Sequence, residues 1–352
     1  MTQTYTNDQP FTLDSGATLP GFHLAYTTHG KLNAAKDNVI WIFHALTANS
    51  NPLEWWPGLV GEGKYFDSAK YFIICVNKPG SPYGSISPVS INPLKNKPYY
   101  NDFPVFTIRD MIRTYQHLRS HLGVKKIFLA LGGSTGGMQL LEWAIEEPSL
   151  FEYIVPIATN AALSPWAIAF NASQRMAIEA DSTWLDRKTD AGQKGLAAAR
   201  SIALLSYRQY NGYDITQPRD KAFVPLSGDV IYAADNYQRY QGLKLVNRFH
   251  ALCYYRLSQS MDSHDVGRDR GGVENALKRI TAKTLVIGIT SDVLYPIGEQ
   301  EYLRQTIPGA ELLSIQSDFG HDGFLLEYEK IETALKKFVH DRYTNNLKIA
   351  TR

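Results

Sequence analysis

The stretch LALGGSTGGMQLLEWA, residues 129–144, decides the fold of this 352-residue chain. An apolar run enters a cluster of glycines, a single serine, Ser134, lies at its centre, and an apolar pattern with helical spacing follows. Residues 132–136 match G-x-S-x-G, in which the chain leaves a strand and enters a helix with almost no loop. The serine then adopts a strained backbone conformation, and its neighbours must lack bulky side chains. The stretch therefore predicts a strand, a sharp turn that presents Ser134 as a nucleophile, and a helix.

Two other glycine-rich turns compete with this interpretation. A dinucleotide-binding loop needs the spacing G-x-G-x-x-G, and a nucleotide-phosphate loop needs G-K-S or G-K-T. Residues 131–137, LGGSTGG, supply neither pattern. A turn that only lets the strand and the helix pack closely is the remaining structural alternative.

Apolar runs rich in β-branched residues recur along the chain, at residues 22–30, 38–46, 71–77, 125–131, 152–159 and 283–290. Several are continuous rather than alternating, which is typical of strands buried on both faces of a parallel sheet. Residues 106–123 have apolar positions at helical spacing and end in glycine, so they read as a crossover helix. The alternation predicts an α/β fold with a mostly parallel sheet and helices on both faces.

The pattern changes between about residue 161 and residue 273. No convincing strand run occurs there, and three helix-like segments are rich in Ala, Gln, Arg and Tyr. We predict a helical lid at residues 163–274, inserted into a core formed by residues 1–162 and 275–352. It would lie on the side of the carboxyl ends of the strands, where α/β sheets bind ligands.

The bulk composition excludes several classes of protein. The 36 basic and 34 acidic residues leave a net charge of +2, which gives no reason to expect a nucleic acid or an anionic membrane as partner. Two distant cysteines, Cys75 and Cys253, form neither a disulfide framework nor a zinc site, and we expect two buried thiols. The N-terminus lacks a signal pattern, and no apolar run approaches the about 20 residues that span a bilayer. We expect a soluble cytoplasmic protein without a metal or a resident cofactor.

A nucleophilic serine needs a general base and a residue that orients the base. In enzymes with this turn, the acidic residue and the histidine follow the serine in that order. Asp292 comes just after the strand-like run at 283–290, and His321 lies in a glycine-flanked loop before a helix. Asp318 and Asp322 also carry carboxylates, but they lie too close in sequence to His321 to orient it. The order therefore predicts a Ser134–Asp292–His321 triad.

A tetrahedral oxyanion needs backbone donors beside the serine. Thr135 offers its N–H at the start of the predicted helix. The second donor comes from the loop after an early strand, where residues 44–47 read HALT, and we predict the N–H of Leu46. His44 would brace this loop rather than transfer protons. His264, in the unusual stretch MDSHDVGRDRGG, is expected to be a hydrogen-bonding loop residue.

Taken together, separated segments of the chain resemble one family, the homoserine O-acetyltransferases of the α/β-hydrolase superfamily. The segments are LAYTTHGKLN (24–33), NVIWIFHALTANS (38–50), YGSISPVSINP (83–93), FPVFTIRDMIR (103–113), LGGSTGGMQLLEWA (131–144), IATNAALSPWAIAFNASQRMAIEAD (157–181), GLAAARSIALLSYR (195–208), MDSHDVGRDRGG (261–272), ITSDVLYPIGEQ (289–300) and GHDGFLLE (320–327). They occur in the family's order over nearly the whole chain. The resemblance implies the triad above, the helical lid, and a homodimer built through the lid helices.

The resemblance also implies how the acceptor is recognised. In the family, an arginine in the corresponding helix binds the substrate carboxylate, and a tyrosine lies further along the same face. Here these are Arg200 and Tyr207, whose spacing of seven places both on one face of a helix. Asp322, directly after the histidine, would meet the substrate amine. A guanidinium fork suits a carboxylate and an acidic group suits an ammonium, so the set would recognise an α-amino acid.

The implied reaction is a ping-pong transfer of an acetyl group from acetyl-CoA to the hydroxyl of L-homoserine, a step of methionine biosynthesis. Thr135 stands where the family usually has methionine, residues 77–88 replace a more glycine-rich segment, and Ala48 replaces a glycine. These departures leave succinyl-CoA open as donor. L-serine stays open as acceptor, because a difference of one methylene changes binding by only about 1–3 kcal/mol. Two other classes also remain, an esterase that uses the same triad with water and a non-catalytic binding protein.

Overall fold

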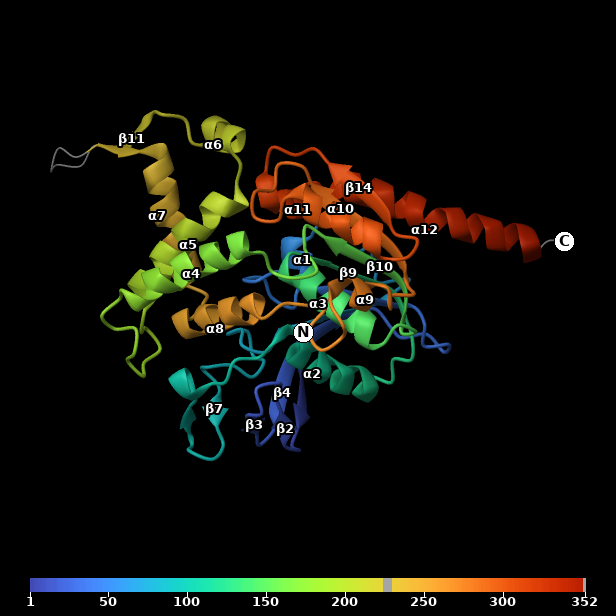
Figure 1. Cartoon of the computed structure of the whole chain (residues 1–352), viewed down its shortest axis with the longest axis horizontal. Coiled ribbons are helices and arrows are strands. Elements are labelled where there is room, and N and C mark those ends of the chain that lie inside the picture. Colours follow the sequence, from blue (N-terminus) through green and yellow to red (C-terminus); the bar gives the residue numbers. More distant parts are fainter. Residues whose placement is uncertain (224–229, 351–352) are drawn as a thin grey trace.

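The computed structural model describes residues 1–223 and 230–350, and the side chains of residues 1–220 and 230–339. Its centre is an eight-stranded sheet with the order β1-β4-β6-β5-β9-β10-β13-β14 (Figure 1). In that order, the strands are Thr2–Asn7, Phe22–His29, Phe72–Val76, Val39–Phe43, Ile127–Gly133, Phe151–Ile157, Lys283–Ile289 and Glu311–Ile315. β4 pairs antiparallel with β1 and β6, and every other pair is parallel. The predicted α/β fold with a mostly parallel sheet is confirmed.

Helices cover both faces of this sheet, and neighbouring residues of a central strand explain why. In β5, Trp41 and Phe43 point into one apolar cluster, whereas Ile40 and Ile42 point into a second cluster on the opposite face. Strands buried on both faces read as continuous apolar runs. The first cluster includes side chains of α2 (Ile108–His121), α3 (Thr135–Glu146), α9 (Val273–Leu277) and α10 (Ile297–Thr306). The second is covered by α1 (Pro52–Trp55), α11 (Gly323–Leu326) and α12 (Tyr328–Ala350).

Some strands differ from the sequence-based expectation. β1 was not anticipated, because its residues are polar and mostly exposed, and it is an edge strand paired only with β4. The lid segment also holds a short hairpin, β11 (Lys221–Phe223) and β12 (Ile231–Tyr232), where we expected helices alone. Strands of two or three residues are too short to leave a periodic pattern. The other short pairs are β2 (Phe11–Thr12) with β3 (Thr18–Leu19) and β7 (Ile91–Asn92) with β8 (Lys97–Pro98), and single turns of 3₁₀ helix occur at η1 (Tyr100–Asp102) and η2 (Gly320–Asp322).

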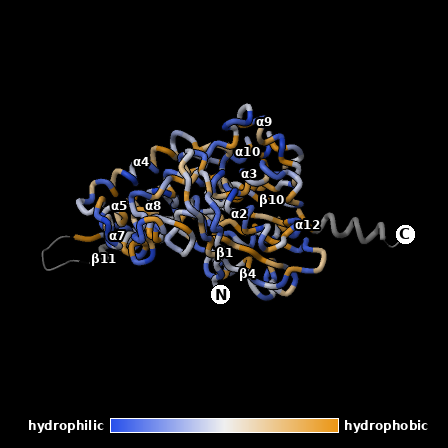
Figure 2. The backbone as a smooth tube through the Cα atoms, turned by 90° about the horizontal axis from the view of Figure 1, so that it is seen from below, coloured by the Kyte–Doolittle hydropathy of each residue, from blue (hydrophilic) through white to orange (hydrophobic). Residues whose placement is uncertain are grey.

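The segment between β10 and β13 supplies the helices of the lid. These are α4 (Pro165–Glu179), α5 (Gln193–Tyr207), α6 (Tyr210–Thr216), α7 (Ala233–Val246) and α8 (Ala251–Asp262). They lie together at one end of the molecule, opposite the end that carries α12 (Figures 1 and 2). Gly195 lets α5 approach α4 closely, because a Cβ there would stand 2.6 Å from the Cα of Ile178. The domain limits at residues 163 and 274 remain a prediction.

Two further expectations concern the chain as a whole. Cys75 and Cys253 are buried, unpaired thiols, as predicted. Of the helices in the described part of the chain, none combines the length and the apolar composition that crossing a membrane requires.

Candidate active site

The turn between β9 and α3 holds Ser134 in the strained conformation that its sequence predicts. The backbone of Ser134 has a φ of 58° and a ψ of −126°, a region that non-glycine residues rarely occupy. The flanking glycines are needed for close approach rather than for flexibility. A Cβ on Gly132 would stand 2.5 Å from the carbonyl carbon of Gly136, and a Cβ on Gly136 would stand 2.3 Å from the oxygen of Phe43. The turn therefore packs closely against β5, and Ser134 lies near the carboxyl ends of β5 and β9.

Asp292 and His321 meet beside this turn. The Nδ1 atom of His321 and the Oδ2 atom of Asp292 are 2.6 Å apart, although the residues are separated by 29 positions. The other carboxylate oxygen accepts the N–H groups of Leu294 and Tyr295, at 2.8 and 3.0 Å. Asp292 is 4% exposed and His321 is 3% exposed, so the pair is shielded from water. The imidazole is thus held in one orientation, with Nε2 left for proton transfer.

The rival carboxylates do not orient His321. Asp318 is exposed and accepts a hydrogen bond from Gln209 at 3.4 Å. Asp322 is paired with Arg208, which follows the lid helix α5. Asp292 is therefore the carboxylate that the structure brings to the imidazole.

Tyr295 is a neighbour of both His321 and Ser134, and sequence reasoning missed it. Its ring centroid is 5.2 Å from that of His321, in an edge-on arrangement. Burial raises the pKa of the Tyr295 phenol well above its ordinary value, and the neighbouring Ser134 hydroxyl acts in the opposite direction. Tyr295 stands three residues after Asp292, but no pattern in the sequence shows where its side chain points.

The two predicted oxyanion donors lie in segments that flank Ser134. Leu46 is in the turn after β5, and Thr135 is the first residue of α3. Within the part of the chain that the structure describes, no acceptor takes the N–H of Leu46 or that of Thr135. Both N–H groups are therefore free to donate to a ligand oxygen.

His44 braces the turn that carries Leu46. Its Nδ1 atom lies 2.8 Å from the carbonyl oxygen of Ala45, and its Nε2 atom lies 3.2 Å from the backbone N–H of Lys78. Because Nε2 accepts, the ring is the neutral tautomer with the proton on Nδ1. Burial, followed by the charge of Lys78, holds the pKa of His44 well below its ordinary value. His44 is thus a structural residue and not a proton carrier.

Lys78 is a second residue that sequence reasoning missed. Its ammonium donates to the carbonyl oxygen of His44 and to Oγ1 of Thr135, both at 2.9 Å. The residue is 1% exposed, and burial lowers the pKa of its ammonium to about 7. Lys78 stands two residues after the buried strand β6, in the run NKPG, and nothing in that run indicates where its side chain points.

On the lid side, α5 carries Arg200 and Tyr207 on one face, as their spacing predicts. The guanidinium carbon of Arg200 is 5.5 Å from the ring centroid of Tyr207, and that ring is 5.6 Å from the ring of His321. No carboxylate of the described side chains forms an ion pair with Arg200. A cation without a counter-charge among the described side chains therefore contacts the Tyr207 ring, which in turn lies next to the ring of His321.

Asp322 is close to the triad but already has a partner. Its carboxylate is paired with Arg208, whose other nitrogen lies 3.2 Å from the hydroxyl of Tyr237. The pair is about one-fifth exposed, at 25% for Arg208 and 18% for Asp322. A substrate ammonium at Asp322 would have to share this carboxylate with Arg208, which the sequence analysis did not single out.

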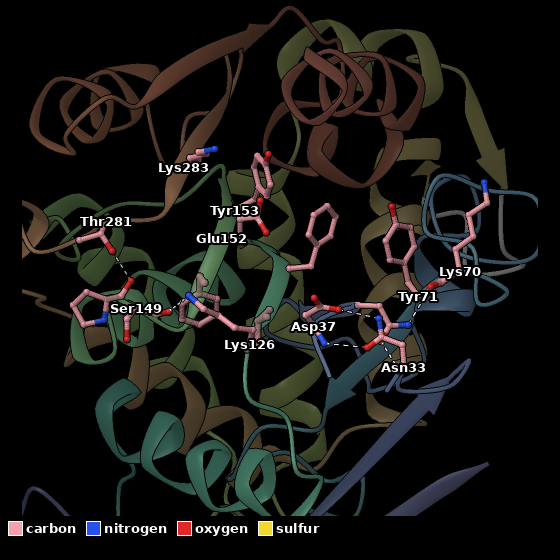
Figure 3. Close-up of a pocket in the computed structure, with 15 residues that line it drawn as sticks. Asn33, Asp37, Lys70, Tyr71, Lys126, Ser149, Glu152, Tyr153, Thr281 and Lys283 are labelled. Carbon is pink, nitrogen blue, oxygen red and sulfur yellow. Dashed lines mark hydrogen bonds between the residues drawn. The ribbon is translucent and has the colours of Figure 1, made fainter. Parts of the chain in front are cut away.

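A groove of about 1030 Å³ lies at the opposite edge of the sheet (Figure 3). Its wall includes Lys70, Lys126, Glu152 and Lys283, at or next to the amino ends of β6, β9, β10 and β13. Ser134, by contrast, follows the carboxyl end of β9. Because parallel strands place these ends at opposite edges, the groove is separate from the triad.

His264 has the loop role expected from its sequence. It is buried, and its Nε2 atom lies 2.9 Å from the carbonyl oxygen of Asn160. Among the described residues, no three His, Cys, Asp or Glu side chains gather in a way that could hold a metal ion.

The chain resembles known proteins over nearly its whole length. A family profile described as the alpha/beta hydrolase fold matches residues 38–328. The chain is 48% identical to a homoserine O-acetyltransferase of Cyclobacterium marinum, over 94% of this chain and 93% of that protein. It is 42% identical to the enzyme of the same name from Chlorobaculum parvum, over 98% of this chain and 96% of that protein. The crystal structure of homoserine O-acetyltransferase from Bacillus anthracis superimposes with a TM-score of 0.88 at 25% identity, covering 96% of this chain and 97% of that one.

Proposed function

The chain belongs to the homoserine O-acetyltransferases, acyltransferases of the alpha/beta hydrolase fold, and from this we propose that it transfers an acetyl group from acetyl-CoA to the side-chain hydroxyl of L-homoserine. The transfer proceeds in two steps through an acetyl ester of Ser134. In this role the enzyme works in the cytoplasm and supplies methionine biosynthesis.

In the first step, Ser134 attacks the thioester carbonyl of acetyl-CoA. Nε2 of His321 takes the hydroxyl proton, and Asp292, bonded to Nδ1 at 2.6 Å, stabilises the imidazolium that forms. The N–H groups of Leu46 and Thr135 donate to the tetrahedral oxyanion, and each such donor is typically worth about 3 kcal/mol. The carbon–sulfur bond then breaks, the imidazolium protonates the departing thiolate, and CoA leaves.

In the second step, L-homoserine attacks the acetyl ester. His321 again accepts the proton, this time from the substrate hydroxyl, and returns it to Ser134 as the ester breaks. Arg200 binds the α-carboxylate through its two parallel N–H groups. Asp322 accepts hydrogen bonds from the α-ammonium, and its carboxylate then interacts with both the substrate and Arg208.

One observation favours transfer to an amino acid over hydrolysis. Arg200 lies within 5.5 Å of the Tyr207 ring, and that ring contacts the ring of His321, yet no carboxylate of the described side chains neutralises the guanidinium. A partly buried cation that is separated from His321 by one tyrosine ring is the arrangement that an acceptor carboxylate would complete. An esterase that admits water has no need of it.

A substrate matrix tests the proposal. Release of CoA is followed with acetyl-CoA or succinyl-CoA as donor and with L-homoserine, L-serine or no acceptor. We expect a burst of about one CoA per active site without acceptor and steady turnover only with acetyl-CoA and L-homoserine. Equal steady rates with and without an acceptor would instead identify a hydrolase, and failure of a fluorophosphonate to label Ser134 would point to a non-catalytic binding protein.

The proposed assembly is a homodimer formed through the lid. A groove of about 750 Å³ between α5 and α7 has apolar side chains in its lining, among them Ile202, Leu243 and Val246, next to charged residues at Lys194, Asp235 and Arg239, and Leu243 is 60% exposed. An exposed apolar surface of this kind is typical of a protein interface. Sedimentation of the wild type and of Leu243→Asp tests the assignment, since a dimer through this groove would dissociate in the variant.

A further inference from the structure

The oxyanion hole has an uncommon residue behind it, a fully buried lysine. Lys78 follows β6, and its ammonium donates to the carbonyl oxygen of His44 on one side and to Oγ1 of Thr135 on the other, both at 2.9 Å. The first contact holds the turn that carries Leu46, and the second holds the first residue of α3. A single side chain thereby ties together the two segments that supply the oxyanion donors.

The charge of Lys78 has no counter-charge among the described residues. No ion pair of the described side chains includes it, and the titratable groups that face it are His44 from the turn after β5 and Cys75 from β6. Burial holds the pKa of His44 well below its ordinary range and raises the pKa of the Cys75 thiol, so both groups are neutral near pH 7. The third neighbour, Thr135 of α3, contributes only a hydroxyl.

An isolated buried cation is unfavourable unless an anion or several hydrogen bonds compensate it. Two acceptors contact the Lys78 ammonium, and one of them is the hydroxyl of Thr135, the residue whose backbone N–H is a proposed oxyanion donor. In the resting enzyme no anion compensates the burial of this ammonium, and burial lowers the pKa of Lys78 to about 7. A negative charge on the oxyanion would supply the counter-charge that Lys78 lacks in the resting enzyme.

We propose that Lys78 is a positioning residue of the oxyanion hole, which fixes the Leu46 and Thr135 donors through His44 and Thr135 and whose positive charge stabilises the tetrahedral oxyanion. This inference rests on the proposed acylation of Ser134. It deepens that function by assigning part of the transition-state stabilisation to a residue outside the triad and outside the two N–H donors. A preorganised charge interacts more strongly with an oxyanion in a site that excludes water than it would in solvent.

The inference has a pH signature with a definite sign. Because the pKa of Lys78 is lowered to about 7, the resting enzyme loses the ammonium as the pH rises through that value. The developing oxyanion favours the charged form, so the rate of acylation depends on the protonated fraction. His44 and Cys75 keep their neutral forms around pH 7, so Lys78 is the group of this cluster that titrates there. Acylation should therefore decline above about pH 7, as Lys78 loses its proton.

The experiment measures acylation of Ser134 by p-nitrophenyl acetate in the full-length protein, from about pH 6 to about pH 9. Lys78→Met replaces the ammonium with an apolar chain of similar length. Thr135→Val keeps the ammonium and the backbone N–H of residue 135 and removes only the hydroxyl that accepts from Lys78. Lys31→Met, at an exposed position, is the matched control.

We expect Lys78→Met to lower the acylation rate constant by about tenfold to hundredfold, since loss of a direct oxyanion donor typically costs about 10²-fold to 10³-fold. KM should change by less than about twofold, and the decline above pH 7 should disappear. Thr135→Val should slow acylation by a smaller factor and keep the decline. The melting temperature of Lys78→Met should match or exceed that of the wild type, because an uncompensated buried charge has been removed.

Three results would overturn the inference. The first is an unchanged acylation rate and pH profile in Lys78→Met. The second is a lower rate in Lys78→Met that is accompanied by a lower melting temperature, with the alkaline decline intact. The third applies if Lys78→Met does not fold, and it is a wild-type acylation rate in Thr135→Val. The ester assay needs neither CoA nor homoserine. A protein that shows the Lys78 effect but does not acetylate homoserine would retain this inference and refute the proposed acceptor, whereas a Ser134→Ala protein that still acylates would refute both.

Discussion

The carboxyl-end edge of the sheet and the lid above it are built in different ways. At the sheet edge, Ser134, Asp292 and His321 are at most 6% exposed, and Asp292 is held by three hydrogen bonds from separate residues. On the lid, Arg200 and Tyr207 are partly exposed and reach the triad through a contact between rings. Ser134, Asp292 and His321 are thus held in place before a substrate binds, whereas the lid residues that are proposed to select the acceptor are less constrained.

The difference has a physical origin in how each region is anchored. β9, β10 and β13 are hydrogen-bonded to one another as parallel neighbours, so residues at their ends are held by the whole sheet. The lid helices pack mainly on one another, and Arg208 with Asp322 is the ion pair that links α5 to the loop of the histidine. A preorganised edge suits transition-state stabilisation, and a separate layer lets the acceptor specificity differ without changing that edge.

The largest expected effect tests whether the sheet edge alone carries the chemistry. Ser134→Ala should lower kcat for acetyl transfer by roughly 10⁴-fold to 10⁶-fold, because loss of the nucleophile removes the covalent route. Steady-state CoA release measures it, with mass spectrometry to detect the acetylated protein. A variant that keeps more than about a tenth of the activity would show that Ser134 is not the nucleophile.

The second prediction tests the hydrogen bond that orients the base. Asp292→Asn preserves the shape of the side chain but removes the negative charge that accepts the hydrogen bond from Nδ1–H and stabilises the imidazolium, so kcat should fall by about 10⁴-fold. Fluorophosphonate labelling of Ser134 should slow in parallel. Asp318→Asn is the matched control, because Asp318 is exposed and does not contact the imidazole, and it should retain the wild-type rate.

The third prediction separates the lid from the sheet edge. Arg200→Met should raise KM for L-homoserine by roughly tenfold to hundredfold, since a hydrogen-bonded charge pair is worth about 1.5–3 kcal/mol. Acylation by p-nitrophenyl acetate should stay unchanged, because that step needs no acceptor. Arg304→Met on α10, an exposed position far along the chain, serves as control. A matching loss in both assays would mean that Arg200 supports the triad instead of binding the acceptor.

The smallest expected effect concerns the ion pair between lid and core. Arg208→Gln removes a competitor for the Asp322 carboxylate, so KM for L-homoserine should fall by roughly twofold to fivefold, the range that a partly exposed ion pair supports. Thermal unfolding should show a loss of less than about 1 kcal/mol. An increase in KM would show that Arg208 holds Asp322 in place for the substrate, and no change would mean that Asp322 does not bind the ammonium.

Several elements were predictable because their signals are local. The continuous apolar runs of β5, β9 and β13 follow from burial on both faces, and the turn at Ser134 follows from its flanking glycines. The polar edge strand β1 was missed because pairing with β4, rather than its own pattern, defines it. The hairpin of β11 and β12 was missed because its strands are too short to show a period.

The residues of the candidate site likewise include some that the sequence indicates and some that it does not. The order of Ser134, Asp292 and His321 in the chain pointed to a triad, and the structure brings the last two together across 29 residues. Tyr295 and Lys78 carried no usable signal, because a tyrosine or a lysine after a strand is common and its direction depends on the surrounding fold.

The amino-acid sequence by itself determined the turn that exposes Ser134, the strands that lead to it, and the family to which the chain is similar. These features depend on neighbouring residues, whose steric and hydrophobic preferences act locally. Only the tertiary structure decided which distant groups share an environment. The contact of Lys78 with Thr135 spans 57 positions, and Arg208 meets Asp322 only because α5 lies over the loop of the histidine. Charge and burial act through space, so their effect at the oxyanion hole becomes visible once the chain is folded.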